Sequence, residues 1–244
     1  MLKILGIIPA RFGSTRFPGK PLVDIDGKTM IQRVFEQAKS CTSLTDVIVA
    51  TDDERIFNEV TRFGGKVAMT STNHQSGTDR CAEVVTNLTE NFNVVINIQG
   101  DEPFINPEQI KQLCNCFADS KTQIATLVKK ISSSEDLFNE NKVKAVIDKN
   151  NFALYFSRNP IPYFRCEPKE NWLNKHNYFK HIGIYGYQTA VLKEITQLNP
   201  SALELTEGLE QLRWLENGYN IKVAETELEA TAIDTPEDLE KILA

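Results

Sequence analysis

Leu2-Lys-Ile-Leu-Gly-Ile-Ile8 is the stretch that decides the fold, because every residue in it except Lys3 is apolar or glycine. A continuous apolar run of this kind is typical of a strand that is buried on both faces of a parallel sheet. Similar runs occur further along the chain, at residues 46–51 and 94–99, with a shorter and weaker one at 66–70. We therefore predict a mostly parallel central sheet whose first strand covers residues 2–8.

Amphipathic stretches separate these runs. Apolar residues recur at helical spacing in residues 30–38, 56–63 and 81–88. An alternating β-α-β-α-β order requires right-handed crossovers with helices on both faces of the sheet, and ligands then collect at the carboxyl ends of the strands. We therefore expect the functional site to follow Ile8, Ala50 and Gln99.

The second half of the chain has a different pattern. Strand-like runs lie at residues 124–128, 143–148, 152–156 and 182–187, with no long helix among the middle ones. They predict an added antiparallel region. Residues 204–215 and 236–243 are predicted helices, the second with Thr235 as N-cap, Pro236 at the first position and Asp238 completing a capping box. Residues 166–180 are predicted to form the longest loop, and no linker divides the chain, so we expect one domain over residues 1–244.

Composition excludes several classes of protein. The 27 Lys and Arg against 33 Asp and Glu give a net charge of −6, which argues against a general nucleic-acid or anionic-membrane binder. No apolar run approaches the ~20 residues of a membrane span, and no signal-peptide pattern is present. Five cysteines without a C-x-x-C pair argue against a disulfide framework or a zinc site in an intracellular chain. We therefore expect a cytoplasmic protein.

Pro9-Ala-Arg-Phe-Gly-Ser-Thr-Arg-Phe-Pro-Gly-Lys-Pro-Leu22 follows the first strand and brings Arg11, Arg16 and Lys20 within ten residues. It contains neither the G-x-G-x-x-G of a dinucleotide fold nor a Walker A loop, which argues against a nicotinamide dehydrogenase and a P-loop kinase. Glycines, hydroxyls and three cations suit a nucleoside triphosphate. The alternative, three solvated surface charges, is weaker at a strand's carboxyl end in an acidic protein.

The same segment resembles the signature of the sugar-acid cytidylyltransferases, specifically the 3-deoxy-manno-octulosonate (Kdo) cytidylyltransferases, or CMP-Kdo synthetases, of lipopolysaccharide synthesis. The sialic-acid branch usually has Lys at the position of Thr15 and lacks the Phe17-Pro-Gly-Lys-Pro21 run, which favours the Kdo branch. The clearest departure is Ala232-Ile233, at a place often filled by Gly-Val. Further blocks resemble the family in the family's order: Ala50-Thr-Asp-Asp53, His74-Gln-Ser-Gly-Thr-Asp-Arg80, Asn97-Ile-Gln-Gly-Asp-Glu-Pro103, Tyr155-Phe-Ser-Arg158, His181-Ile-Gly-Ile-Tyr-Gly-Tyr187, Leu209-Glu-Gln-Leu-Arg213 and Asp234-Thr-Pro-Glu-Asp-Leu239.

The resemblance implies a fold and a reaction. The fold is α/β, a three-layer Rossmann-like nucleotidyltransferase fold, with residues 1–120 mainly binding nucleotide and residues 121–244 mainly binding sugar and forming a homodimer. In the reaction, a hydroxyl of Kdo attacks the α-phosphorus of CTP and pyrophosphate leaves. Two alternatives stay open: a cytidylyltransferase for another acidic sugar, such as an amino-substituted Kdo or a sialic-type acid, and a non-catalytic nucleotide-sugar binding module.

The resemblance also implies the roles of individual residues. Asp101 and Asp234 are the expected ligands of Mg²⁺, and Arg158 is the expected partner of the sugar carboxylate because its planar fork suits that group. The nucleotide is expected to contact Arg11, Ser14, Arg16, Lys20, Ser76, Gly77, Thr78 and Arg80, and catalysis is expected to depend on Lys20, Arg11, Arg16 and Asp101. The sugar acid is expected to contact Gln99, Arg158, His181, Tyr185, Glu210 and Gln211.

Several of these residues have an ordinary structural alternative. Asp101 could cap the turn into Pro103, and Thr78 could be the N-cap of the helix that follows it. His181 could be a hydrogen-bonded core histidine, while Glu210 and Gln211 could form an exposed helical face. The sequence names no general base, and a metal-bound alkoxide would make one unnecessary.

Overall fold

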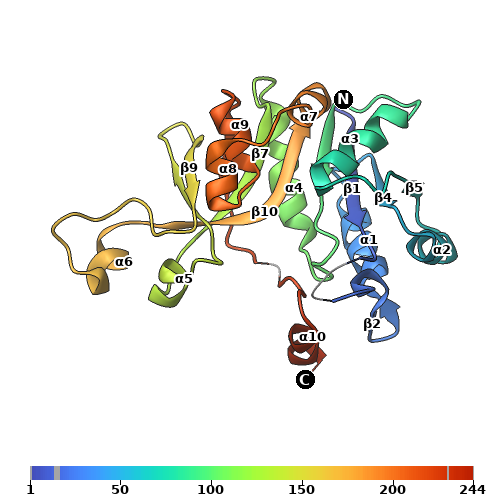
Figure 1. Cartoon of the computed structure of the whole chain (residues 1–244), viewed down its shortest axis with the longest axis horizontal. Helices are drawn as coiled ribbons and strands as arrows, with labels where there is room; N and C mark the ends of the chain where they lie inside the picture. Colours follow the sequence, from blue (N-terminus) through green and yellow to red (C-terminus); the bar gives the residue numbers. More distant parts are fainter. Residues whose placement is uncertain (1, 14–16, 230, 244) are drawn as a thin grey trace.

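A computed structural model describes residues 2–13, 17–229 and 231–243 of the chain. Its strands are β1 (Ile4–Ala10), β2 (Asp24–Ile25), β3 (Lys28–Thr29), β4 (Asp46–Thr51), β5 (Val67–Met69), β6 (Val94–Asn97), β7 (Ile124–Lys130), β8 (Lys144–Ile147), β9 (Ala153–Ser157), β10 (Phe179–Gln188) and β11 (Ile221–Glu225). The main sheet runs in the order β11-β7-β10-β6-β1-β4-β5, with β8 and β9 joined to β10 off this path (Figure 1). Strands β6, β1, β4 and β5 are parallel, whereas β10 is antiparallel to both of its neighbours.

Helices cover both faces of this sheet. One face packs against α1 (Met30–Ser40), α2 (Glu54–Arg62) and α4 (Pro107–Asn115), and the other against α3 (Gly77–Asn87), α7 (Thr189–Ile195) and α9 (Gln211–Glu216). Alternate residues of β1 enter opposite cores: Leu5 and Ile7 join the second group of helices, while Ile4 and Ile8 join the first. This double burial explains why the first strand is apolar throughout, and it confirms the three-layer α/β fold with a mostly parallel sheet.

The predicted strands are found, with different bounds. β1 continues past Ile8 because Pro9 and Ala10 pair with the end of β4. β6 ends at Asn97, two residues earlier than predicted, whereas β10 begins at Phe179 and spans more of the sheet than the 182–187 run indicated. The added region is antiparallel at β10 and at β8–β9, as expected, but the unpredicted strand β11 is parallel to β7.

Two predictions of local structure in the second half are wrong. The single helix predicted at 204–215 is two helices, α8 (Ala202–Glu207) and α9, because Gly208 adopts a left-handed conformation with φ of 64° and ends α8. The predicted long loop at 166–180 contains a 3₁₀ turn at Lys169–Asn171 and the short helix α6 (Trp172–Lys175), and its last residues already belong to β10.

An arm projects from the main body on the side of β8 and β9 (Figure 1). We define the arm as α5 (Ser134–Phe138) together with residues 159–178, which include α6. It has a small core of its own, in which Trp172 and Tyr178 stack with ring centroids 6.0 Å apart. Among the described residues, no helix is long and apolar enough to cross a membrane.

Gly100 allows the ends of β1 and β6 to approach each other closely. A Cβ atom on Gly100 would lie 2.6 Å from the carbonyl oxygen of Pro9, which is closer than Cβ atoms come to backbone. The two strands are also tied there by a 2.8 Å hydrogen bond from the Ile98 N–H to the Ile7 carbonyl. The turn after β6, which carries Asp101, therefore passes directly beside the end of β1.

We predict that Gly100→Ala destabilises the protein by about 1–3 kcal/mol, because the added methyl group meets backbone that cannot move aside cheaply. Gly183→Ala is the matched control, since a Cβ at Gly183 would meet no atom within 4 Å. Denaturant unfolding of both variants is the measurement. Equal stability of Gly100→Ala and wild type would contradict the close approach described here.

Candidate active site

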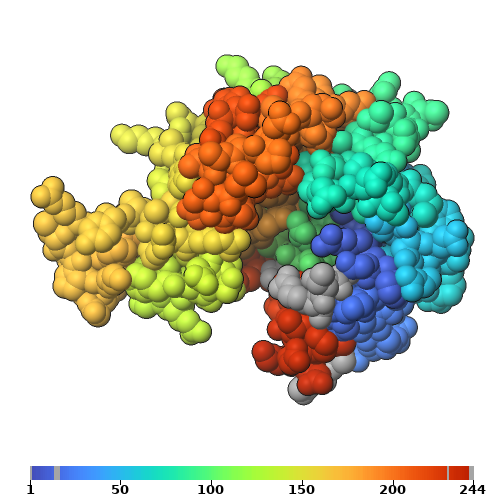
Figure 2. Space-filling model, in the orientation of Figure 1, coloured from blue at the N-terminus to red at the C-terminus, as the bar shows by residue number. Residues whose placement is uncertain are grey.

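A cavity of about 270 Å³ opens at the ends of β1 and β6 and at the start of α3. Figure 2 shows the molecule hollowed between α3, in teal, and the orange-red α8–α9 segment. Residues 51–53, which follow Ala50, do not line the cavity themselves, but the Asp52 carboxylate there accepts from Arg80, which does. The residues predicted for the site that line it are Arg11, Lys20, Ser76, Gly77, Arg80, Gln99, Asp101 and Asp234.

Lys20 lies between two carboxylates inside this cavity. Its ammonium group donates to Asp101 Oδ2 at 2.9 Å and to Asp234 Oδ1 at 3.2 Å. Only 12% of the Lys20 side chain is exposed, so the cation is held largely away from water. Two carboxylates that are 133 residues apart in sequence thus converge on one positive charge.

The loop after β1 brings Lys20 to this position by folding back on itself. Gly19 has φ of 74°, which favours glycine, and its N–H donates to the Phe12 carbonyl at 3.0 Å. A short 3₁₀ turn, Lys20–Leu22, starts directly afterwards. Ser14 and Arg16, both predicted phosphate contacts, lie outside the described residues.

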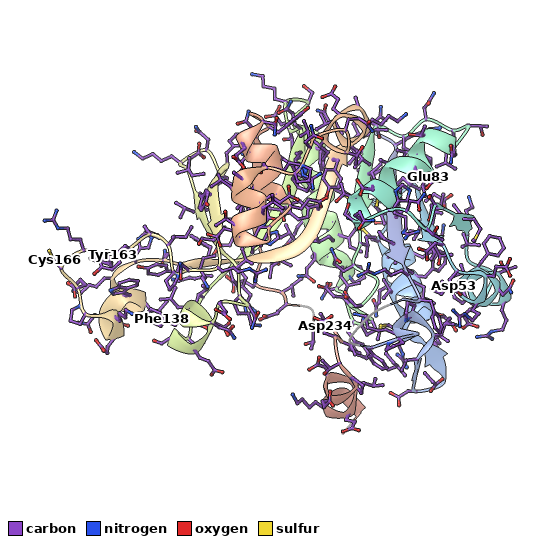
Figure 3. The ribbon with its side chains drawn as sticks, in the orientation of Figure 1. Asp53, Glu83, Phe138, Tyr163, Cys166 and Asp234 are labelled. Atoms are coloured by element: carbon purple, nitrogen blue, oxygen red, sulfur yellow. The ribbon has the colours of Figure 1, made fainter. Side chains whose placement is uncertain are left out.

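Asp234 is held beside Asp101 by its neighbours. The N–H of Ile233 donates to the Asp101 carbonyl at 2.9 Å, and the Ile233 side chain is fully buried with Ile25 and Met30. The residue at the Ala232-Ile233 departure therefore anchors the loop. Figure 3 shows Asp234 on the segment that leads into α10 (Pro236–Leu243). The predicted capping box of this helix is confirmed, with mutual hydrogen bonds between Thr235 and Asp238.

The start of α3 forms another wall of the cavity. Ser76, and not Thr78, is the N-cap: its hydroxyl accepts from the Asp79 N–H in a capping box. Thr78 is 3% exposed and does not line the cavity; its hydroxyl donates to Glu210 Oε2 at 2.7 Å. Arg80 lines the cavity, but its guanidinium also donates to Asp52 Oδ2 at 2.8 Å. Asp52, within the Ala50-Thr-Asp-Asp53 block, had no predicted role.

Four of the residues predicted to bind sugar lie on β10 or at the start of α9: His181, Tyr185, Glu210 and Gln211. Gln99 connects them to the cavity, because its side-chain amide donates to the Gly183 carbonyl at 2.6 Å. His181 Nε2 lies 3.0 Å from Thr126 Oγ1, and burial lowers the pKa of His181 to about 4, so its imidazole is neutral at neutral pH. Tyr185 is 8% exposed, and its buried hydroxyl has no hydrogen-bond partner among the described residues.

Glu210 and Gln211 do not form an exposed helical face. Gln211 is 5% exposed. Burial raises the pKa of the Glu210 carboxyl, whereas the hydrogen bond from Thr78 lowers it. A second carboxyl that the sequence did not single out is Glu102, whose pKa is raised to about 7 by burial and by the adjacent Asp101 charge. Its place in the Asn97–Pro103 block was the only signal in the sequence.

Arg158 lies against the turn that precedes Glu210. Its Nε donates to the Glu207 carbonyl at 2.7 Å and one terminal nitrogen donates to the Gly208 carbonyl at 3.4 Å. The Glu207 carboxylate in turn accepts from the Arg158 backbone N–H at 2.9 Å. Arg158 does not line the cavity that holds Lys20. It supports the turn between α8 and α9, from which Glu210 and Gln211 extend.

The chain is similar to known cytidylyltransferases over most of its length. A family model described as cytidylyltransferase matches residues 5–226. The 3-deoxy-manno-octulosonate cytidylyltransferase of Parabacteroides distasonis is 61% identical over 100% of this chain and 98% of the relative, and that of Cytophaga hutchinsonii is 55% identical over 99% and 96%.

Solved structures of cytidylyltransferases share the fold of this chain over nearly its whole length. A CMP:2-keto-3-deoxy-manno-octonic acid synthetase complexed with CTP superposes with a TM-score of 0.91 and 44% identity, covering 99% of this chain and 97% of that one. A 4-diphosphocytidyl-2C-methyl-D-erythritol synthase from Anaerococcus prevotii, at 11% identity and a TM-score of 0.64, shares the fold alone. From its sequence, its fold and the residues gathered around Lys20, this chain belongs to the cytidylyltransferase family and is a nucleotidyltransferase.

Proposed function

We propose that this chain transfers the CMP group of CTP to the anomeric hydroxyl of Kdo, releasing pyrophosphate and giving CMP-Kdo for lipopolysaccharide synthesis. The observation that carries the proposal is the convergence of Asp101 and Asp234 on Lys20 in a cavity at the carboxyl end of β1. The high identity to proteins named for this reaction supports the choice of sugar.

We also propose that Asp101 and Asp234 hold Mg²⁺. The donor set fits: both are carboxylates, already placed to share one cation, and Mg²⁺ in such enzymes commonly takes one or two carboxylates and completes its shell with water and substrate phosphates. Among the described residues, no cluster of three or more His, Cys, Asp or Glu side chains suits a metal. When bound, the metal offsets phosphate charge and lowers the pKa of a coordinated hydroxyl.

The cationic loop acts on the triphosphate. Arg11 and Lys20 line the cavity, and Ser14 and Arg16 belong to the same loop by sequence. The Lys20 ammonium is shared between carboxylates and has little contact with water, so it can pass to a phosphate oxygen without a large loss of hydration. Fixed positive charge near the α-phosphorus stabilises the charge that rearranges there during attack. Ser76, Gly77 and Arg80 complete the nucleotide side.

The sugar acid is proposed to lie along β10 and the start of α9. Gln99, Tyr185, Glu210 and Gln211 offer amides, an unpartnered hydroxyl and a carboxylate, which suit a ligand with many hydroxyl groups. The neutral His181 can accept or donate one hydrogen bond there. Arg158 is the proposed partner of the sugar carboxylate; its present hydrogen bonds go to main-chain carbonyls, so binding must use or replace them.

We further propose that the protein works in the cytoplasm as a homodimer. The arm carries exposed aromatic side chains, with Tyr163 74% and Phe138 39% exposed, and Figure 3 shows both far from the main body. A second copy of the chain is the partner that the family resemblance implies. None of the five cysteines, all within the described residues, forms a disulfide, which suits a reducing compartment.

The proposed reaction predicts that pyrophosphate is released only when CTP, Kdo and a divalent metal are all present. The measurement is a coupled pyrophosphate assay with the four nucleoside triphosphates and a panel of Kdo, amino-substituted Kdo and a sialic-type acid. A chelator should abolish turnover and added Mg²⁺ should restore it. Full activity in the chelator would exclude the metal, and faster turnover of another sugar acid would reassign the substrate.

Asp101→Asn and Asp234→Asn are each predicted to lower kcat by more than about a hundredfold, because they remove metal-binding charge at nearly constant volume. The matched control is Asp119→Asn, since the Asp119 carboxylate accepts from the Lys121 N–H in a turn outside the cavity and asparagine keeps that acceptor. Near-normal turnover in either of the first two variants would show that aspartate to be a turn residue only.

A substitution on the exposed surface of the arm tests whether the arm holds the proposed dimer together. Tyr163→Glu places a charge on the exposed aromatic surface and is predicted to reduce the mass measured by light scattering from two chains to one. Leu205→Glu is the matched control, because Leu205 is 72% exposed on α8, outside the arm. A wild-type protein with the mass of a single chain would rule out the dimer.

A further inference from the structure

Thr78 connects two parts of the site that are distant in sequence. Its hydroxyl donates to Glu210 Oε2 at 2.7 Å, across a separation of 132 residues. Thr78 belongs to α3, whose first residues line the nucleotide cavity, whereas Glu210 precedes α9 in the part of the chain proposed to bind sugar. This hydrogen bond links the nucleotide side to the sugar side, and the Ser76 side chain at the same helix start also lowers the pKa of the Glu210 carboxyl by a hydrogen bond.

The Thr78 end of this link is fixed without help from Glu210. On one side, α3 is capped by its own Ser76–Asp79 box and lies close to β1, where a Cβ on Gly77 would meet Pro9 Cγ at 3.3 Å. Thr78 is 3% exposed, so its hydroxyl has little access to solvent as an alternative partner. The structure therefore gives Thr78 a rigid position from which to hold another group.

Glu210 is the less constrained member of the pair. It follows Gly208, where α8 ends in a left-handed conformation, and its side chain does not cap α9. Tyr185, whose pKa the nearby Glu210 charge helps to raise, has a buried hydroxyl that makes no hydrogen bond within the described part of the chain. The Glu210 carboxylate has acceptor sites beyond the one that Thr78 uses, and a sugar hydroxyl can donate to them.

We propose that Thr78 is a positioning residue for the sugar acid: its hydroxyl orients the Glu210 carboxylate so that the other lone pairs face the substrate's hydroxyl groups. This rests on the proposed function, because it assigns Thr78 to the sugar side of that same site. It also replaces the expectation that Thr78 touches the nucleotide. The substrate class recognised through this pair is a polyhydroxylated sugar acid.

The test is steady-state kinetics of Thr78→Val, which keeps the shape of the side chain and removes the hydroxyl. We expect KM for Kdo to rise on the order of tenfold, as for loss of a hydrogen bond to a charged group, while KM for CTP changes less than about twofold. Thr78→Ser should restore wild-type values because it keeps the donor. Thr86→Val is the matched control on the same helix, since the exposed Thr86 hydroxyl only donates to the Ala82 carbonyl of its own helix.

A double-mutant cycle separates positioning through Glu210 from a general disturbance of α3. If Thr78 acts through the carboxylate, adding Thr78→Val to Glu210→Gln should raise KM for Kdo no further than Glu210→Gln alone. Additive effects would overturn the proposal. Thr78→Ala serves in the same cycle if the valine variant does not fold.

The pH dependence of KM for Kdo distinguishes positioning of Glu210 from a purely structural role of Thr78, because a purely structural role would leave it unchanged. Burial already raises the pKa of Glu210, and losing the Thr78 donor should raise that pKa further, so the acid-side rise in KM for Kdo should move to higher pH in Thr78→Val. The other titratable and charged groups that face Glu210 are Asp79, Cys81, Tyr185, Tyr187 and Arg213. None of these residues is replaced in the variant, and of them only Tyr187 loses a side-chain hydrogen bond from Thr78, which lowers its pKa in the wild type.

The possible failures are distinguishable. A wild-type protein that does not use Kdo would remove the proposed function and with it this inference. An active wild-type enzyme whose Thr78→Val variant keeps its KM for Kdo, or loses affinity for CTP and Kdo equally, would leave the function standing and overturn the role of Thr78.

Discussion

The ammonium group of Lys20, held by the carboxylates of Asp101 and Asp234, joins three segments of the chain. One segment follows β1, one follows β6, and the third leads into α10. Each carboxylate and the cation are costly to remove from water alone, but together they neutralise much of each other's charge. The arrangement ties the three segments together and places two carboxylates beside one cation, where the proposal above puts Mg²⁺ and the triphosphate.

The central sheet was predictable because its strands are buried on both faces. A strand such as β1 must then be apolar throughout, and that pattern is visible without any knowledge of its partners. Helices α1 and α3 were predictable for a related reason, since each buries a single stripe with a helical period. The boundaries were less accurate, because the end of β1 depends on pairing with β4 rather than on its own residues.

The sequence did not reveal features that arise from contacts between distant residues. The break between α8 and α9 depends on the conformation of one glycine inside a helical pattern, and β11 depends on its pairing with β7. Asp101 and Asp234 could be paired only through the family resemblance, because 132 residues lie between them. The hydrogen bond between Thr78 and Glu210 had no signal at all, since a threonine near a helix start is more often read as a cap.

The alternation of β1 between two apolar cores has a consequence for strand register. In a sheet with one wet face, a slip of one residue is prevented because it would expose apolar side chains, but in β1 both faces are apolar and burial alone gives little preference. The register is set by small steric and polar details instead: the hydrogen bonds that Ile4 and Thr45 exchange, and Gly6, where a Cβ would come within 2.9 Å of Leu44. The residues that decide where the loop to Lys20 begins are therefore among the least conspicuous in the strand.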